Sequence, residues 1–447
     1  MDGSRARSDG FRSLAVDLGL VFAAKAAVGL YVLHAGFSHI SDDDFARVVI
    51  AQQFAHRPTL DPSGTSWLPF PFWIAGGAML VLGRSLDAAR TVAFVLGVAS
   101  VAVPYLAMRA VGCKRGTSLV AVGAAMALPW SAWVGVATVP EAFTACLVSG
   151  GAIAVTAPRA RIVAAVALLA SALARYEAWP ACATFALTCA LSARRESRGR
   201  ASTAAATAIA LAGPCLWMLW NARAHGSALH FVTRVAAYRQ AIGAAAIPLS
   251  EKLAAFPAAL ANASPSIVGL ALLGLLAIPS DAALRKRWLS PLGSAVAILA
   301  FLVYGDVRDG APTHHPERAV LPILWILAPF AADALRTLAG RVAWGRPQRE
   351  MVVFGVAAAG ALAWAVALPR RLRDAPGLSA SESRAAQTLR GRELARTSDP
   401  HERWVVTPCG YEHFALVAAE SEPERFTLLP PTHEAVTPAC PRLESSP

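Results

Sequence analysis

Charged residues are scarce in this chain of 447 residues: only 16% are Asp, Glu, Lys or Arg, whereas 55% are hydrophobic. A chain with so little polar surface cannot cover itself as a soluble globule. Apolar stretches of roughly 15 to 22 residues recur from Leu14 to Leu368, and each is about long enough to cross a bilayer. We therefore predict an all-α polytopic membrane protein.

The signatures of several enzyme classes are also missing from the sequence. There is no Walker loop and no GxGxxG motif, and the short loops between apolar segments leave no room for a nucleotide-binding domain. There is no HExxH, no CxxC and no spaced set of His and Asp, so a divalent metal stays an unsupported alternative and no cofactor is implied. The formal charge of +12 comes without an interleaved basic and aromatic surface, so we expect no nucleic-acid partner.

The basic residues that are present predict the topology. Candidate spans are residues 14–36, 67–83, 91–108, 117–136, 139–157, 161–175, 178–192, 201–221, 265–280, 289–305, 319–336 and 351–368. Clusters such as Arg5 to Arg12, Lys114-Arg115 and Arg285 to Arg287 place the N-terminus and alternate loops in the cytoplasm. Strict alternation leaves residues 67–83 surplus, and we interpret that segment, interrupted by Pro69 and Pro71, as juxtamembrane or re-entrant; two ordinary crossings are the alternative.

This topology predicts about 11–12 transmembrane helices within a membrane domain of residues 1–369, whose first external loop is residues 37–66. Most of the notable polar residues then fall on one face, outside the cytoplasm. They are Asp42 to Asp44, Glu141, Arg175 to Glu177 and the stretch from Asp306 to Arg318. An enzyme built this way brings its substrates together at the outer membrane surface without nucleotides.

The composition becomes polar after the last apolar segment, and we predict a small external α/β domain over residues 370–447. Residues 378–396 have an amphipathic helical pattern, while 404–407 and 426–429 read as strands around a helix at 411–420. Five of the seven cysteines lie in or beside apolar segments, where a thiol acts as a small hydrophobic group. Cys409 and Cys440 lie in this domain, where an external compartment would allow a disulfide.

Three adjacent carboxylates, Asp42, Asp43 and Asp44, follow the first apolar segment. Ser41 and Asp44 form a capping-box-like start to an amphipathic helix that we expect to lie on the membrane surface, and the helix dipole would keep first-turn carboxylates ionised and able to act as bases. Successive helical residues are rotated by about 100°, so at most two of the three point into one cavity. The alternative is that the cluster only caps a surface helix.

The run SDDDFARVVIAQQFAH (residues 41–56), followed by WLPFPFW (residues 67–73), resembles the first external loop of GT-C glycosyltransferases. That superfamily includes the protein mannosyltransferases, the lipid A aminoarabinose transferases and the GPI mannosyltransferases. Pro140-Glu141, the triplet Arg175-Tyr176-Glu177 and the stretch from His314 to Arg318 also fit the family pattern. The resemblance covers roughly residues 14 to 340, and this chain has three Asp residues where many relatives have Asp-Glu.

The resemblance implies inverting transfer of a mannose-like or related sugar from a polyprenyl-phosphate carrier to an acceptor glycan, lipid or protein. Such transfer needs a base for the acceptor proton and cations for the departing phosphate. Asp43 is the first choice for the base, with Asp42 and Asp44 as alternates. The candidate substrate-binding residues are Glu141, Arg175, Tyr176, Glu177, His314, His315, Glu317 and Arg318.

Less specific interpretations stay open for each motif. Arg175 and Glu177 can be an interfacial ion pair beside belt aromatics, Glu141 can decorate a helix start, and the segment from His314 can be a solvated loop. The rival functions are a transporter or flippase of lipid-linked sugars, and an inactive GT-C-like scaffold. We expect a bacterial inner-membrane protein with its active face and C-terminus outside the cytoplasm.

Overall fold

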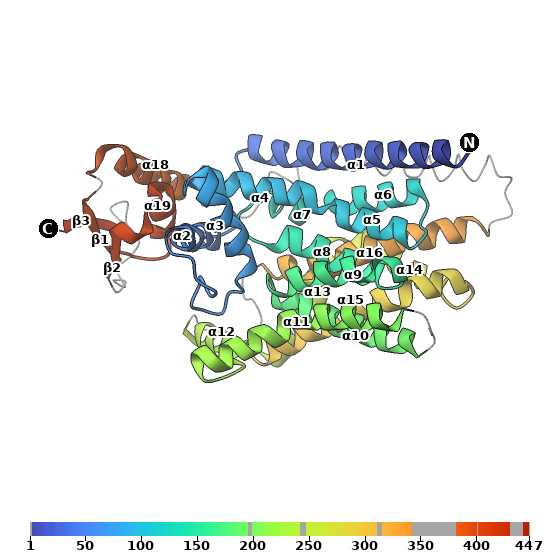
Figure 1. Cartoon of the computed structure of the whole chain (residues 1–447). Helices are drawn as coiled ribbons and strands as arrows, with labels where there is room; N and C mark the ends of the chain where they lie inside the picture. The colour runs from blue at the N-terminus through green and yellow to red at the C-terminus, as the bar shows by residue number, and fades with distance from the viewer. Residues whose placement is uncertain are drawn as a thin grey trace.

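The structure, a computed structural model, is a long helical bundle with a small sheet at one end (Figure 1). It describes residues 2–194, 199–241, 247–310, 315–341, 381–399, 401–429 and 441–446. The N-terminus lies at one end of the long axis, and the C-terminal sheet lies at the other, beside α2 and α3 (Figure 1). The predicted fold class, a helical polytopic membrane protein with a small C-terminal α/β unit, is confirmed.

The helices before the C-terminal segment are mostly short and closely spaced. They are α1 (Asp2–His34), α2 (Asp43–His56), α3 (Phe70–Leu82), α4 (Leu86–Ser100), α5 (Ala102–Ala110), α6 (Arg115–Met126), α7 (Pro129–Trp133), α8 (Glu141–Ala154), α9 (Arg161–Ala172), α10 (Trp179–Ala193), α11 (Arg200–His225), α12 (His230–Ala241), α13 (Leu249–Ala263), α14 (Pro265–Leu275), α15 (Ala282–Val307) and α16 (Pro316–Ala339).

Five helical stretches among the described residues are long and apolar enough to cross a membrane, and a sixth is added if α13 and α14 count as one span bent by 97°. The five are Arg12–His34, Leu86–Ala110, Arg200–His225, Ala282–Val307 and Pro316–Ala339. The protein is therefore a multi-pass membrane protein, although fewer described helices than the predicted 11–12 meet this length.

Prolines and glycines explain why several predicted spans are divided or short. Pro129 begins α7 and separates it from α6, because proline is favoured in the first turn of a helix and not in its interior. The surplus segment at 67–83 forms α3, an apolar helix of 13 residues that starts after Pro69 and ends at Gly83. The predicted span 351–368 lies outside the described residues.

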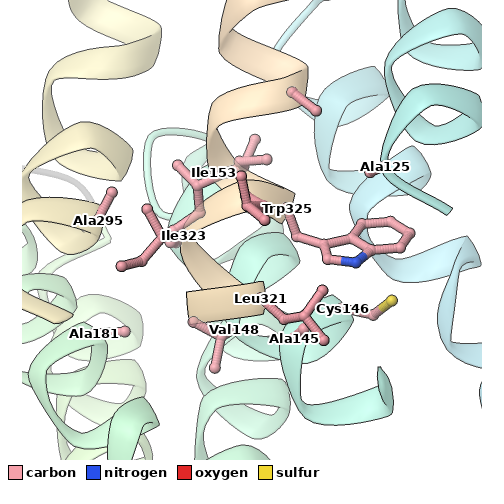
Figure 2. Packing of buried hydrophobic residues seen from close by; sticks show 14 of the residues in the cluster. Ala125, Ala145, Cys146, Val148, Ile153, Ala181, Ala295, Leu321, Ile323 and Trp325 are labelled. Carbon is pink, nitrogen blue, oxygen red and sulfur yellow. The ribbon is translucent and has the colours of Figure 1, made fainter. Parts of the chain in front are cut away.

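The centre of the bundle is α16, whose apolar window is 83% buried, compared with 28% to 39% for the other long spans. Figure 2 shows Leu321 and Trp325 of α16 beside Ala145 and Cys146 of α8. The small residues of α8 let the two backbones approach closely, which is the usual basis of helix packing in membranes. The Ser149 hydroxyl donates a hydrogen bond to the Trp325 carbonyl oxygen at 2.6 Å. This bond holds the middle of α8 against α16.

The C-terminal segment, residues 381–446, contains α18 (Ser381–Thr397), α19 (His413–Glu420) and a sheet of β1 (Arg403–Thr407), β2 (Phe426–Leu428) and β3 (Arg442–Ser446). The strand order is β2-β1-β3, with β1 parallel to β2 and antiparallel to β3. The helices and the first two strands occur where the sequence predicts them, whereas β3 was not predicted. Cys409 is disulfide-bonded, and Cys440 lies outside the described residues.

The apolar face of α2 packs against protein. Phe45, Val48 and Val49 of α2 form one hydrophobic cluster with Met79 of α3 and with residues 415–419 of α19. Because α2 carries two of the three adjacent aspartates and follows the third, its packing determines where these carboxylates lie. This packing differs from the predicted helix lying on the membrane surface, since an apolar face is buried equally well against another helix.

Candidate functional site

The three adjacent aspartates have three different environments. Asp42 is the N-cap of α2 but does not cap its own helix; its two carboxylate oxygens accept hydrogen bonds from Arg384 at 2.6 and 2.8 Å. Asp44 is only 3% exposed. The Asp43 side chain is 44% exposed and lies 3.6 Å from a terminal nitrogen of Arg318. Of the three, Asp43 is the carboxylate that solvent or a ligand reaches most easily.

Asp44 ties the start of α2 to the loop before α8. Its carboxylate accepts hydrogen bonds from the backbone N–H groups of Ile40, Ser41 and Thr138 at 3.1 to 3.2 Å. Burial raises the pKa of Asp44 to about 6, although these hydrogen bonds and the charge of Arg318 oppose the change. Half of the predicted capping box therefore forms: Ser41 N–H donates to Asp44, whereas the Ser41 hydroxyl is buried without a hydrogen-bond partner among the described residues.

Asp43 belongs to a continuous ion-pair network of five side chains. Arg318 lies between Asp43, at 3.6 Å, and the carboxylate of Glu141, at 3.7 Å. The same Glu141 oxygen accepts a hydrogen bond from Arg175 at 2.5 Å, and Arg175 also pairs with Glu177. Glu141 and Glu177 are buried, so the network extends from a half-exposed carboxylate into the protein. Residues far apart in the sequence are thus brought to one place, as the predicted clustering of polar groups requires.

Three helices begin at this network, and their N-termini add positive potential to that of the arginine side chains. Asp43 is in the first turn of α2, Glu141 in that of α8, and Glu317 in that of α16, where Pro316 occupies an early position. Helix N-termini carry partial positive charge and unpaired N–H groups, which favour anions. In addition, His315 has a φ of 53°, an uncommon value for a residue other than glycine, and this bend turns the chain into α16.

Arg47 is a further cation of the site. It lies one turn after Asp43 on α2, is 9% exposed, and stacks on the Trp67 ring at 4.3 Å. Burial lowers its pKa, while the carboxylates Glu141 and Asp43 oppose that change. Its Nε is buried and donates no hydrogen bond within the described ranges, and neither does Glu141 Oε2 accept one there. Buried polar atoms without partners at one site indicate where a ligand or water binds.

A pocket of about 40 Å³ lies beside Arg47, between α2, α3, α4 and α8. Arg47 and Thr138 are its polar lining groups, and its other walls are apolar, including Phe72, Leu96 and Phe143. This volume holds a few water molecules but not a sugar. A larger ligand at the network would therefore occupy the open side next to Asp43.

Aromatic residues surround the network. The Tyr176 hydroxyl donates to the Ser66 carbonyl oxygen at 2.9 Å, and the Tyr176 ring stacks on Phe231 with centroids 4.4 Å apart. The His315 ring lies 5.3 Å from that of Trp130. On the exposed side, Tyr238 of α12 lies near Asp43 and Tyr411; burial and then these two neighbours raise its pKa to about 12. His314 lies outside the described residues.

The sequence interpretation missed Arg47, Tyr238, Tyr411 and Arg384 as members or neighbours of the site. Arg47 had a usable signal, because residues four apart on a helix face the same side and Asp43 precedes it by four. Tyr238, Tyr411 and Arg384 are far from residues 42–44 in the sequence, and no local pattern encodes their approach to Asp42 and Asp43.

No family model matches the chain, and no curated protein matches it. Among solved structures, the chain is similar to the oligosaccharyltransferase AglB of the archaeon Archaeoglobus fulgidus, solved in complex with an inhibitory peptide and a dolichol-phosphate. The similarity has a TM-score of 0.49 and 12% sequence identity, and it covers 91% of this chain. The chain spans 63% of the length of AglB, a GT-C membrane glycosyltransferase. A likeness of this size does not assign a family.

Proposed function

We propose that this protein is a GT-C-like glycosyltransferase that moves a sugar from a polyprenyl-phosphate carrier to an acceptor, with inversion. The observation that carries the proposal is the position of Asp43. Its half-exposed carboxylate lies 3.6 Å from Arg318, at the convergence of helix N-termini in a multi-pass membrane protein. A base beside a cationic site is the combination that sugar transfer from a lipid phosphate requires.

In the proposed reaction, Asp43 takes the proton of the acceptor hydroxyl as its oxygen attacks the anomeric carbon. The bond between that carbon and the phosphate oxygen breaks, and the electron pair leaves with the lipid phosphate. The environments of its neighbours support Asp43 over the two alternates. Asp42 is held by Arg384, and the oxygens of Asp44 face backbone N–H groups.

The departing phosphate gains negative charge as the bond breaks, and Arg318 and Arg47 are the proposed groups that stabilise it. Both are largely buried, and both lie near Asp43. Guanidinium groups fork onto phosphate oxygens, and buried cations act in a medium that screens them weakly. The N-termini of α2, α8 and α16 add partial positive charge in the same place.

Arg175 has a supporting role in this proposal. Its guanidinium nitrogens already donate to Glu141 and to both oxygens of Glu177. Three of its nitrogens are already hydrogen-bonded to carboxylates, which makes Arg175 a poor phosphate ligand, whereas Arg318 lies farther from its two carboxylates, at 3.6 and 3.7 Å. The ion-pair interpretation of Arg175 and Glu177 is therefore favoured. Arg175 then fixes Glu141, which in turn orients Arg318. Tyr176 precedes Glu177 and packs on Phe231, and His315 lies against Trp130. Glu317 precedes Arg318 in the first turn of α16.

The site is proposed to face the outside of a bacterial inner membrane, with the N-terminus in the cytoplasm. The positive-inside distribution of Lys and Arg supports this orientation. The sugar is proposed to be mannose or a related hexose, on the strength of the sequence motifs shared with mannosyltransferases. The acceptor is proposed to carry a hydroxyl or similar nucleophile, because such a group has a proton that the carboxylate base can remove.

The experiment is reconstitution of the full chain in vesicles that contain a radiolabelled polyprenyl-phosphate sugar. Appearance of label in water-soluble or acceptor-bound product, with release of the lipid phosphate, would support the transferase. Label that crosses the bilayer while it stays on its lipid would instead establish a flippase. If neither occurs with any lipid-linked sugar that binds, the inactive-scaffold alternative is correct and the proposal fails.

A further inference from the structure

The C-terminal segment contacts the start of α2 through Asp42. Nε and a terminal nitrogen of Arg384, on α18, donate to the two oxygens of Asp42 at 2.6 and 2.8 Å. The side chains of Arg384 and Asp42 are only 18% and 24% exposed. Two parallel charge-assisted bonds fix both direction and distance, which a single bond does not. Asp42 makes this pair in place of the cap hydrogen bond usual for an aspartate at a helix N-cap.

The opposite end of α2 is held by the same segment. The side-chain amide of Gln52 donates to the carbonyl oxygens of Ala418, at 2.8 Å, and Arg84, at 2.7 Å. Between these two ends, Phe45 and Val48 of α2 pack on the apolar residues of α19. The C-terminal segment therefore contacts α2 at its beginning, its middle and near its end.

Arg384 is itself held in a closely packed place. At Gly391, α18 approaches α19 so closely that a Cβ would collide with the Leu416 carbonyl oxygen. Two buried histidines, His39 and His413, lie near both Asp42 and Arg384. Burial lowers the pKa of both imidazoles, to about 4 for His39, so both are neutral near pH 7. Both side chains of the Asp42–Arg384 pair are largely buried, so water screens their attraction less than that of an exposed pair.

We propose that Arg384 is a positioning residue that acts through Asp42: it fixes the first turn of α2 and so holds the adjacent Asp43 toward Arg318. The proposal rests on the proposed function for the role of Asp43. The C-terminal segment then contributes to the reaction, because Arg384 holds Asp42 and the proposed base, Asp43, is the next residue.

The test compares Arg384→Gln with Arg392→Gln in the full chain. Arg392 is a matched control because it also lies on α18 and pairs with an aspartate, Asp87, at 2.8 Å, but the side chains of that pair are 40% and 68% exposed. Arg384→Gln should lower kcat for sugar transfer about 10-fold or more, because small misplacements of a reacting group are costly. The KM for the lipid donor should change less than about 2-fold, since the proposed phosphate-binding arginines are untouched.

A second readout does not depend on activity. Amide hydrogen exchange of residues 43–47 should become faster in Arg384→Gln and stay at the wild-type rate in Arg392→Gln. The double variant Asp42→Arg with Arg384→Asp should restore slow exchange and part of kcat, and Arg384→Lys serves if the glutamine variant does not fold. Equal exchange and equal kcat in the two glutamine variants would overturn the proposal. Faster exchange in Arg384→Gln, together with a wild type that transfers no sugar, would leave Arg384 as a positioning residue and refute the proposed function.

Discussion

At the scale of single residues, the three adjacent aspartates show how position decides chemistry. They share a side chain and differ only in partner: a guanidinium for Asp42, an exposed face near Arg318 for Asp43, and backbone N–H groups for Asp44. The helical rotation between neighbours separates them onto different faces. The helical periodicity of the sequence limited to two the aspartates that can point into one cavity, but it did not show which of the three is the base.

Asp44→Asn is expected to change the pH dependence of stability. The pKa of Asp44 is about 6 in the folded protein and about 3.9 in an unfolded chain, so the folded state binds the proton more tightly. Its contribution to stability is then complete below about pH 4 and is lost as the pH rises through about 6. The free energy of unfolding of the wild type, relative to Asp44→Asn, should fall over this interval by on the order of 2 kcal/mol.

Thermal unfolding in one detergent at pH 4, 5, 6 and 7 measures this difference, and every other carboxyl group cancels because both proteins share it. A constant difference in unfolding temperature across this range would show that Asp44 has the same pKa in the folded and unfolded states, which would contradict the raised pKa.

At the scale of elements, close backbone approaches position the helices that carry the site. At Gly97, α4 meets the segment between α7 and α8 so closely that a Cβ would collide with the Gly135 carbonyl oxygen. Gly97 also lines the pocket beside Arg47. Hydrophobic periodicity predicts that these helices exist, but it does not show which glycines lie at a close contact between segments and which are exposed.

Gly97→Ala should therefore destabilise the protein by about 1 to 3 kcal/mol, because the helices must separate or shift to accept the methyl group. Gly123→Ala in α6 is the control, since no heavy atom outside the helix lies within 4 Å of its Cβ position. That substitution should be neutral or stabilise by up to about 1 kcal/mol. Equal unfolding temperatures for both variants in the same detergent would mean that the close approach at Gly97 is absent.

Local patterns predicted the helices and strands better than they predicted the contacts between them. Capping residues and alternating hydrophobicity sufficed for α2, α18, α19 and β1, because those signals lie within each element. The count of membrane spans was less predictable, since Pro129 divides the predicted span 117–136 into α6 and α7. The docking of α19 on α2 involves residues about 370 positions apart, such as Gln52 and Ala418.

At the scale of the whole molecule, the distribution of basic residues predicts the orientation in the membrane. The start of α2, which carries Asp43, and the C-terminal segment lie toward one end of the long axis, and the N-terminus lies at the other (Figure 1). An enzyme that uses lipid-linked sugars outside the cytoplasm needs the first end to be external. The basic residues predicted that arrangement, and labelling tests it.

Single cysteines at Ser250 and Gly116, in a background with Cys215→Ser, should react differently with an impermeant thiol reagent. Both positions are exposed, Ser250 on α13 and Gly116 beside the basic pair that begins α6. Ser250→Cys should be labelled in intact cells, whereas Gly116→Cys should be labelled only after permeabilisation. Labelling of Gly116→Cys in intact cells would reverse the proposed topology.

The most informative single measurement is sugar transfer by Asp43→Asn, made alongside binding of the polyprenyl-phosphate donor. Asparagine keeps the size of the side chain and its hydrogen bonding but cannot accept the acceptor proton. Transfer should fall about 100-fold or more, as expected when a general base is lost. Donor affinity should stay within about 2-fold of wild type, because Arg318 and Arg47 are proposed to hold the phosphate. Transfer at the wild-type rate by Asp43→Asn would contradict the assignment of Asp43 as the base, and with it the proposed mechanism.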